Sequence, residues 1–293
     1  MSNTEIIEVI RNCRFSRSDL EAYATETGAG RGAIEKDFFI SIILITLGEM
    51  DEFSELADRI VFKGGTCIKK LFYPHEARFS EDLDFSNLSM EDCRSFHRRV
   101  DSELVGQNLG VTKLINTQVI YEDERGLDLQ LNYLSLLGQR NHIMINLSTA
   151  PALRKTSESE LHVKPYFDFV KIKILTMDIN EIVAEKTRAL LQRHKPRDVF
   201  DVWFLMDKKE MKLDIHLLKE KLVRSYNAAP PEKRKDLGRY TMSSVISEIK
   251  DSVTQTSWRN ELGGLLMRPF PERNLVIERV SEILVEIGDI SVV

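Results

Sequence analysis

Two short segments of the chain combine residue types that bind metal ions and phosphate. The first is Lys63-Gly-Gly-Thr66. The second runs from Arg78 to Asp84 and contains the acidic pair Asp82 and Asp84, with 16 residues between Gly65 and Asp82. Residues two apart on a strand point to the same face, so Asp82 and Asp84 are expected to project together. Two adjacent carboxylates repel unless a cation lies between them. Because Mg²⁺ takes one or two carboxylates together with phosphate oxygens and water, the pair predicts a magnesium site for a nucleotide.

The glycine pair predicts the matching phosphate contact. A strand–Gly–Gly–helix turn lets backbone N–H groups approach an anion, and the start of the helix favours negative charge. The candidate nucleotide-binding residues are those in and around the two segments: Lys63, Gly64, Gly65, Thr66, Arg78 and Ser80. Two plainer interpretations stay open, namely a solvated strand end and an ordinary turn with Thr66 as the N-cap.

A second group of charged residues lies in the later, helical part of the chain. Lys186 falls on the apolar stripe of a helix expected from Ile182 to Gln192, where it could either snorkel or bind phosphate. Pro196 suits the first turn of the next helix, in which Asp198 and Asp201 share a face. Compensation of the helix dipole explains Asp198 equally well.

The elements that must position these residues follow from the periodicity. Helices are expected over the first fifty residues, including 34–47, and β-structure in the middle. The predicted strands are 59–63, 83–86, 127–133 and 142–147, and a helix is expected over 66–73. The polar stretch 151–164 predicts a boundary between a domain over 1–155 and one over 165–293. The second domain should be helical, with helices at 182–192, 197–207, 215–226, 243–252 and 275–287.

Composition and charge exclude several classes of protein. The 293 residues carry a net charge of -5 and 42% hydrophobic residues, which argues against disorder and against a wholly basic nucleic-acid binder. The range 186–239 holds 15 Lys/Arg and 8 Asp/Glu, a local charge of +7, so the rest carries -12. A solvated surface or a phosphate-rich partner explains this basic region. Three cysteines without a CxxC pair, no apolar run of about 20 residues and no signal-peptide pattern predict a cytoplasmic protein with no membrane partner.

Four motifs in order resemble the AbiEii/AbiGii-type nucleotidyltransferase toxins, which belong to the polymerase-beta-like superfamily. They are Glu35-Lys-Asp-Phe-Phe39, the Lys63–Thr66 turn, the Arg78–Phe85 segment, and Ala184-Glu-Lys-Thr-Arg-Ala-Leu190 running into Arg193-His-Lys-Pro-Arg-Asp-Val-Phe-Asp-Val-Trp203. The resemblance implies an α+β fold: a minimal nucleotidyltransferase α/β domain with N-terminal helices, packed on a C-terminal helical domain that completes the active-site cleft.

The resemblance also implies roles for individual residues. Asp82 and Asp84 would bind the metal, Mg²⁺ or Mn²⁺, and would be catalytic together with Lys186 and Asp198. Lys186 would contact the triphosphate of the NTP substrate, and Asp198 would support the site from the helical side. Family members are toxins of toxin–antitoxin or phage-abortive-infection pairs, which implies a cognate antitoxin. Some transfer a nucleotide to the 3′ end of tRNA, so tRNA or another RNA is the expected acceptor.

One position departs from the family pattern. Where the family has a third acidic residue, in a segment like I-K-I-[DE]-[IV]-S, this chain has Asn146 within Ile143-Met-Ile-Asn-Leu-Ser148. An amide can coordinate a metal but cannot act as a base. Three explanations stay open: Asp128 on the neighbouring strand substitutes, the register of the match is wrong, or the enzyme is slow.

The sequence therefore predicts a metal-dependent nucleotidyltransferase that moves a nucleoside monophosphate from an NTP to an acceptor hydroxyl. The alternatives are a catalytically weak or silent nucleotide-binding module, which Asn146 favours, and nucleotidylation of a protein target.

Overall fold

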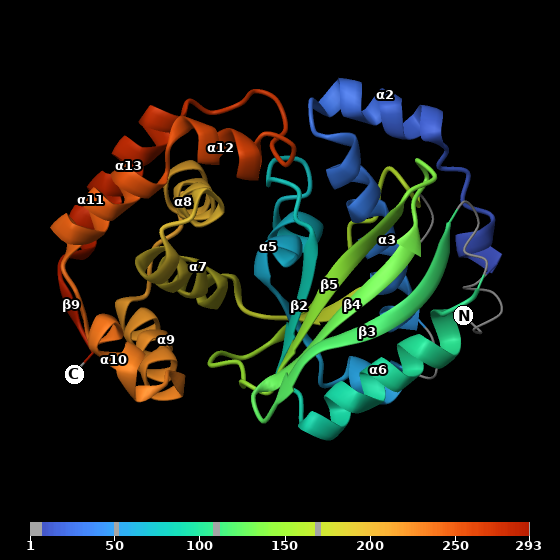
Figure 1. Cartoon of the computed structure of the whole chain (residues 1–293), viewed down its shortest axis with the longest axis horizontal. Helices are drawn as coiled ribbons and strands as arrows, with labels where there is room; N and C mark the ends of the chain where they lie inside the picture. Colours follow the sequence, from blue (N-terminus) through green and yellow to red (C-terminus); the bar gives the residue numbers. More distant parts are fainter. Residues whose placement is uncertain (1–7, 50–52, 108–111, 168–170, 293) are drawn as a thin grey trace. The chain divides into compact units, whose positions relative to one another are not determined.

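The structure is a computed structural model that describes residues 8–49, 53–107, 112–167 and 171–292. Contacts within the chain divide it into two compact units. The first comprises residues 1–177 together with 265–268, and the second comprises 178–264 together with 269–293. Figure 1 shows the helices and strands of both units. The polar stretch 151–164 lies within the first unit, and the separate domains 1–155 and 165–293 stay a prediction.

The first unit begins with helices, and recognisable capping residues mark the two ends of the first of them, α2. In α2 (Arg17–Thr27) the Ser16 side chain accepts from the Asp19 backbone, Asp19 accepts from the Ser16 N–H, and the helix ends at Gly28 with φ 76°. This reciprocal capping satisfies donors that a helix start otherwise leaves unpaired. Helix α3 (Arg31–Glu49) follows and is buried along most of its length, as its apolar spread predicts.

A mixed seven-stranded sheet forms the body of this unit, in the order β3-β4-β5-β2-β1-β7-β6. The β1–β7 and β2–β5 pairs are parallel and the other pairs are antiparallel. The strands are β1 (Val61–Lys63), β2 (Asp82–Ser86), β3 (Lys113–Asp123), β4 (Gly126–Leu134), β5 (Arg140–Ser148), β6 (Ser157–Glu160) and β7 (Lys173–Thr176). Between them lie α4 (Ser54–Ala57), α5 (Gly64–Cys67), which continues as a π-helical segment Ile68–Phe72, and α6 (Met90–Leu104).

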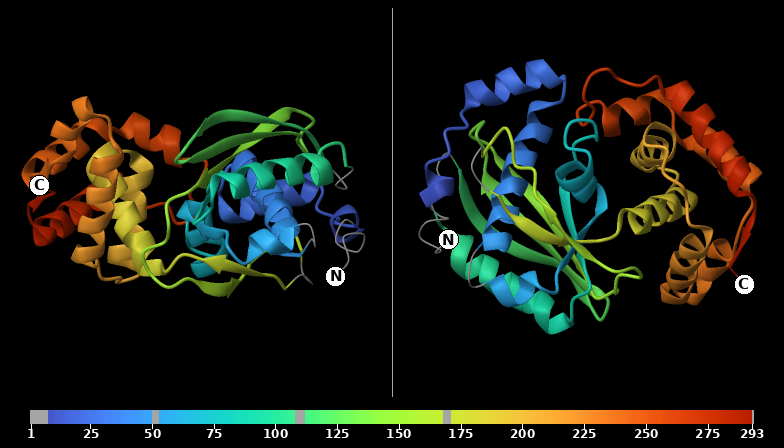
Figure 2. Two further views of the ribbon diagram at one scale, coloured as in Figure 1. Left: turned by 90° about the horizontal axis from the view of Figure 1, so that it is seen from below. Right: turned by 180° about the vertical axis from the view of Figure 1, so that it is seen from behind.

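One face of the sheet carries the core of this unit, because α3 and α6 pack against it. Tyr133 of β4 contacts Phe39 of α3 with ring centroids 3.6 Å apart, and Phe85 of β2 contacts Phe96 of α6 at 6.0 Å. The views from below and from behind in Figure 2 show these helices beside the strands. The opposite face holds the residues that alternate with the buried ones along β2, β4 and β5.

The second unit is a set of helices with one small two-stranded sheet. Its helices are α7 (Ile179–Arg193), α8 (Pro196–Trp203) with a π-helical continuation Phe204–Lys208, α9 (Ile215–Ala228), α10 (Pro231–Leu237), α11 (Met242–Ser252), α12 (Gln255–Leu262) and α13 (Arg273–Ile287). Strands β8 (Arg239–Tyr240) and β9 (Ile290–Ser291) pair antiparallel. In the described parts of the chain, no helix is both long and apolar enough to cross a membrane.

The expected α+β arrangement is confirmed: N-terminal helices, a mixed sheet and C-terminal helices follow in order. The predicted strands 59–63, 83–86, 127–133 and 142–147 correspond to β1, β2, β4 and β5. Helix α6 and strands β3, β6 and β7 were not among the expected elements.

Candidate active site

The acidic pair lies on β2 as the strand periodicity predicts. Leu83 and Phe85 are fully buried, whereas Asp82 and Asp84 are half-buried on the other face. Phe85 also contacts Phe62 of β1 with ring centroids 5.3 Å apart. The apolar residues therefore hold β2 in the core and present both carboxylates on the face that α3 and α6 leave open.

The Gly-Gly turn lies directly against the second carboxylate. Gly64 has φ +83°, a conformation that L side chains rarely adopt, and a Cβ added there would come closer to Asp84 Oδ2 than real Cβ atoms come. Glycine is therefore required at this position for two reasons, the left-handed backbone and the close approach of the carboxylate.

The other predicted nucleotide-binding residues around this turn fall into two groups, one with half-buried and one with buried side chains. Lys63 is half-buried and pairs directly with Asp84 in the β1–β2 register, so its side chain lies on the carboxylate face. Ser80 is also half-buried. Thr66 is buried, and its hydroxyl donates to the backbone carbonyl of Asp82. Arg78 is buried and donates from Nη1 to the carbonyl of Phe79 at 3.0 Å.

Thr66 and Arg78 thus make structural contacts that the sequence did not predict for them. The Thr66 hydrogen bond ties the turn to the strand that carries the acidic pair. Gly65 lies between Gly64 and Thr66 in α5. Whether Gly65, Thr66 and Arg78 also contact a nucleotide stays a prediction.

Asn146 lies beside the acidic pair. The parallel β2–β5 register places it opposite Asp84, and its Nδ2 donates to Asp84 Oδ1 at 3.0 Å. The β4–β5 register places Asp128 opposite Asn146 on the same face. These pairings argue against the explanation that Asn146 was matched in the wrong register.

Asp128 is the next carboxylate along this face. Burial raises its pKa above the usual value for an aspartate, and the negative charges of Asp84 and Asp123 raise it further. A carboxyl group with a raised pKa accepts a proton more readily than one with the ordinary value. Of the explanations left open above, substitution by Asp128 is therefore favoured by its position.

The donor set fits a divalent ion that binds with its substrate. Among the described residues, no group of three or more His, Cys, Asp and Glu side chains is arranged to hold a metal without other ligands. Asp82 and Asp84 supply two carboxylates on one face, and Mg²⁺ needs no more than that when phosphate oxygens and water complete its octahedron. Asp82 and Asp84 could thus hold Mg²⁺ or Mn²⁺ together with an NTP.

The charged triplet 35–37 in the apolar helix α3 makes contacts that the sequence did not predict. Lys36 forms an ion pair with Glu81, next to Asp82, with Nζ and Oε1 3.0 Å apart. Glu35 accepts from the backbone N–H of residue 137 at 3.2 Å. The triplet ties α3 to two neighbouring segments, and the signal for this role was three charges in a buried helix.

Asp37, the last residue of the triplet, forms a buried network of its own. Its carboxylate accepts from Lys70 Nζ at 2.7 Å and from the Tyr166 hydroxyl at 2.9 Å. Lys70 also donates to Ser41 at 2.9 Å. Burial lowers the pKa of Lys70 and raises that of Tyr166, and the Asp37 charge opposes the first shift and adds to the second. The network anchors the segment after the Gly-Gly turn to α3.

The predicted residues of the helical unit are both paired within that unit. Lys186 Nζ lies 2.7 Å from Asp201 Oδ2, and both side chains are largely buried. Asp198 accepts two hydrogen bonds from Arg193, at 2.6 and 3.1 Å. This bidentate geometry holds Asp198 more firmly than the helix dipole would. The contact of Lys186 with a triphosphate stays a prediction.

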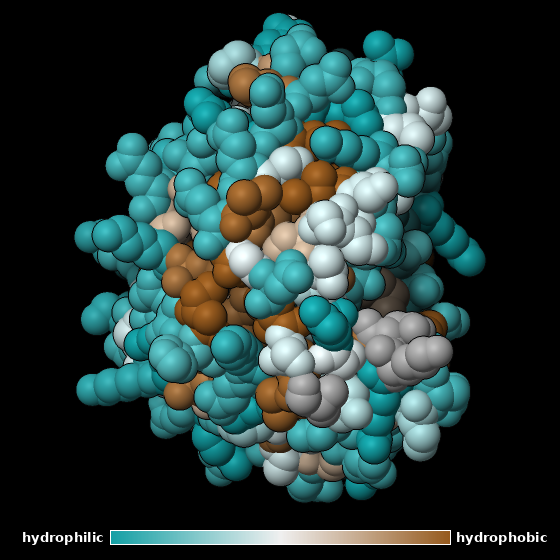
Figure 3. All heavy atoms as spheres, turned by 90° about the vertical axis from the view of Figure 1, so that its left-hand side faces the viewer, coloured by the Kyte–Doolittle hydropathy of each residue, from teal (hydrophilic) through white to brown (hydrophobic). Residues whose placement is uncertain are grey.

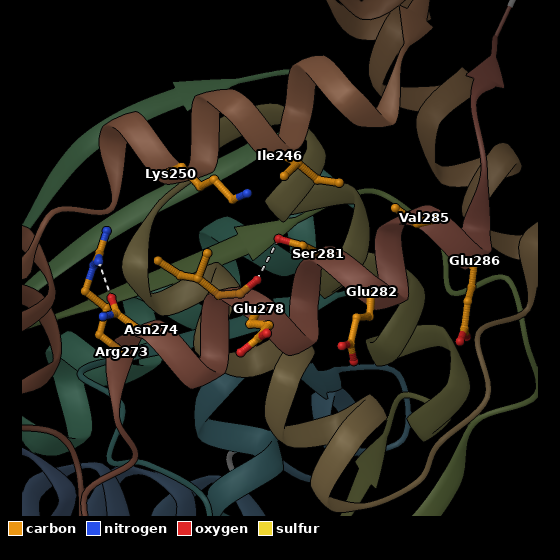
Figure 4. A pocket seen from close by; sticks show the side chains of 10 residues that line it. Ile246, Lys250, Arg273, Asn274, Glu278, Ser281, Glu282, Val285 and Glu286 are labelled. Carbon is orange, nitrogen blue, oxygen red and sulfur yellow. Dashed lines mark hydrogen bonds between the residues drawn. The ribbon is translucent and has the colours of Figure 1, made fainter.

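A groove of about 1030 Å³ between α11 and α13 contains none of the predicted site residues. It is lined by Ile246, Lys250, Arg273, Asn274, Ile277, Glu278, Ser281, Glu282, Val285 and Glu286 (Figure 4). The Ser281 hydroxyl donates to the Ile277 carbonyl at 2.7 Å, as it does within many helices. Figure 3 shows apolar side chains gathered on this side of the helical unit, and the Val285 side chain is 67% exposed.

Several solved structures share this fold. The nucleotidyltransferase toxin MenT4 of Mycobacterium tuberculosis H37Rv matches with a TM-score of 0.69 and 18% identity, over 93% of this chain and 89% of that one. JHP933 of Helicobacter pylori matches with a TM-score of 0.54 and 16% identity, over 88% of this chain and 93% of that one. A further H. pylori structure matches with the same TM-score and identity, over 87% of this chain and 94% of that one.

No curated protein sequence matches the chain. The family model described as "Nucleotidyl transferase AbiEii toxin, Type IV TA system" matches residues 47–284, which include β1, β2, β5 and α7 to α12 in full. The chain therefore belongs to the AbiEii family of nucleotidyl transferase toxins of type IV toxin–antitoxin systems.

Proposed function

We propose that this nucleotidyltransferase transfers a nucleoside monophosphate from an NTP to the 3′ hydroxyl of an RNA, with tRNA as the first candidate, in a reaction that depends on Mg²⁺ or Mn²⁺. The observation that carries the proposal is the pair Asp82 and Asp84, which β2 presents on one face beside the Gly-Gly turn. Its cellular partners would be the NTP, the RNA and a cognate antitoxin, and it would act in the cytoplasm.

The reaction requires one bond to form and one to break. The acceptor oxygen attacks the α-phosphorus of the NTP, the bond to the bridging oxygen of the β-phosphate breaks, and pyrophosphate leaves. A divalent ion held by Asp82 and Asp84 would neutralise charge on the phosphates. Lys63, on the same face as Asp84, would attract the phosphates as a point charge. Lys186 would contact the triphosphate, with Asp198 supporting the site.

The acceptor hydroxyl must also lose its proton. Asn146 has no basic group, so we assign proton acceptance to Asp128, the next carboxylate in the same cross-strand row. The raised pKa of Asp128 supports this assignment because a general base works best when its pKa lies near the working pH. Asn146, through its hydrogen bond to Asp84, would position the metal-binding carboxylate rather than take part in proton transfer.

Incubation of the protein with each labelled NTP and total tRNA tests the proposal. Label should enter RNA with Mg²⁺ and not with a chelator, and should disappear in Asp82→Asn and Asp84→Asn. The matched control is Asp58→Asn, an exposed aspartate of the same unit, which should transfer label at the wild-type rate. Asp128→Asn should lower kcat and remove the acidic limb of its pH profile.

Two other outcomes would overturn the proposal. Label found in protein and not in RNA would select nucleotidylation of a protein target. NTP binding in calorimetry with no transfer, together with no growth arrest on expression, would select a silent nucleotide-binding module. Asn146 is the observation that favours this second candidate function, since an amide stands where the family has a carboxylate.

A further inference from the structure

The open face of the sheet continues well beyond the acidic pair. Along β4, the residues Leu127, Leu129, Leu131 and Tyr133 are buried against the helices. The residues between them, Asp128, Gln130 and Asn132, are half-buried on the opposite face, and Leu134 follows with 43% exposure. These intervening side chains are polar along three successive positions of the open face.

The strand register arranges the open face in four cross-strand rows. We call this surface the β3–β5 face. From the acidic pair outward, the rows are Asp84–Asn146–Asp128–Tyr121, then Asp82–Met144–Gln130–Gln118, then His142–Asn132–Asn116, and finally Arg140–Leu134–Lys113.

The chemistry of the rows changes steadily along the strands. The first row carries carboxylates, and the second carries both a carboxylate and side-chain amides. The third row carries two amides and an imidazole, and the fourth places Lys113 and Arg140 on either side of Leu134. Gln130 donates from Nε2 to Asn132 Oδ1 at 2.8 Å, which confirms that neighbouring amides share the face. Tyr121, at the end of the first row, is 45% exposed.

This order of groups matches the parts of a nucleic-acid strand. Side-chain amides both donate and accept, as the edges of bases require. Exposed aromatic rings stack on bases, and Lys and Arg bind phosphates. The carboxylates, by contrast, need a cation before any phosphate can approach them.

The length of the face fits a short single strand. Successive rows are two residues apart on a strand that rises about 3.3 Å per residue, so the first and fourth rows lie about 20 Å apart. That distance spans about six nucleotides at the 3.4 Å stacked spacing of a nucleic-acid strand and fewer when the strand is extended. A peptide would instead pair with a strand edge through its backbone, and this face offers side chains.

We infer that the β3–β5 face binds the single-stranded 3′ end of the acceptor RNA, with the terminal hydroxyl at the first row and upstream phosphates at Lys113 and Arg140. The inference rests on the proposed function, because it takes the acceptor to be RNA. The amides of Gln130 and Asn132 contact bases that are unpaired, since short side chains on a sheet reach base edges only where the bases are splayed out. Asp128 then lies next to the hydroxyl that reacts.

Steady-state kinetics with an RNA oligomer that has a single-stranded 3′ end tests this assignment. Gln130→Leu and Asn132→Leu should each raise the KM for RNA five- to tenfold and leave the Kd for NTP within twofold, since a neutral hydrogen bond contributes about 1 kcal/mol. Lys113→Ala and Arg140→Ala should each lower the slope of log KM against log salt by about one. The same oligomer annealed into a blunt duplex should be a poor acceptor.

Two exposed residues outside the face serve as matched controls. Gln255→Leu, at the start of α12, and Arg17→Ala, on α2, should leave both the KM and its salt slope unchanged. An unchanged KM in the Gln130 and Asn132 variants, with transfer intact in the wild type, overturns the inference and leaves the proposed function standing. Equal use of the blunt duplex overturns it as well.

A failure of the proposed function has a different signature. If the wild type labels no RNA, the same variants are compared by fluorescence anisotropy with a labelled oligomer. Weaker RNA binding in the Gln130, Asn132, Lys113 and Arg140 variants then supports the face as an RNA site without transfer. RNA binding that is absent, or equal in all variants, overturns the inference together with the function.

Discussion

Replacement of Gly64 by alanine separates the backbone role of this glycine from its role beside Asp84. A left-handed residue with a side chain costs roughly 1–2 kcal/mol, and the lower entropy of the unfolded alanine chain returns roughly 0.4–1 kcal/mol. The new Cβ also displaces the Asp84 carboxylate, which loses its hydrogen bond from Asn146 at a further cost of about 1 kcal/mol. Gly64→Ala should therefore lower the free energy of unfolding by about 2 kcal/mol.

Gly106→Ala is the matched control for this substitution. Gly106 lies in the same unit with φ +79°, close to the +83° of Gly64, and a Cβ there would meet no atom within 4 Å. It should show the backbone cost of about 1 kcal/mol without the displacement of a carboxylate. Urea unfolding, followed by circular dichroism, measures both values.

Nucleotidyl transfer then distinguishes the two variants. Gly106→Ala should retain wild-type activity at a temperature where both proteins are folded, whereas Gly64→Ala should lose 10- to 100-fold, as is typical when the support of a metal ligand is removed. Full activity in Gly64→Ala would refute the argument that its missing Cβ makes room for Asp84. Equal losses in both variants would show that stability alone explains the effect.

Three further variants test the electrostatics of the two units. Asn146→Asp replaces a hydrogen bond to Asp84 with a like charge, so the metal-free protein should lose about 2 kcal/mol of stability and recover it with Mg²⁺ and NTP together. Unfolding with and without the two ligands measures this, and no dependence on Mg²⁺ in the presence of NTP would contradict a metal at Asp84. Lys186→Met removes the ammonium group that lies 2.7 Å from the buried Asp201 carboxylate and should cost roughly 3 kcal/mol. A change below about 1 kcal/mol in urea unfolding would show that the pair is not buried in solution. Burial lowers the pKa of Lys69 from 10.5 to about 8, so between these pH values the unfolded chain binds more protons than the folded protein. The free energy of unfolding of the wild type should therefore rise over this range by about 3 kcal/mol relative to that of Lys69→Met. A parallel rise in both proteins would show that Lys69 is not responsible.

Local periodicity was sufficient to predict the carboxylate strand but not its surroundings. Alternation along residues 82–86 places Asp82 and Asp84 on one face, and the strand in the structure does the same. The hydrogen bond from Asn146 to Asp84 depends on parallel pairing between β2 and β5, which are not adjacent in sequence. No periodicity within either strand specifies that pairing, because parallel neighbours are chosen by the packing of the whole sheet.

The start of helix α6 has a local sequence signal that is sufficient to predict it. Ser89 and Asp92 form a capping box at the start of α6, and the spacing of serine and aspartate is visible in the sequence. The pairing of Lys186 with Asp201 was not predictable in this way. It joins two helices across a junction at which His194 takes φ 51°, and the angle between two helices is not encoded in the periodicity of either one.

The amide at position 146 changes the direction from which an acceptor can approach. A carboxylate there would put a second acidic group directly beside Asp84, on β5, and the base would lie beside the metal ligands. With Asn146 bound to Asp84, the nearest remaining carboxylate in the row is Asp128 on β4, one strand further out. A hydroxyl that gives its proton to Asp128 must then approach over β4 rather than over β5. The amides of Gln130 and Asn132 extend along that same strand, so the base and the inferred track for the RNA lie on one line.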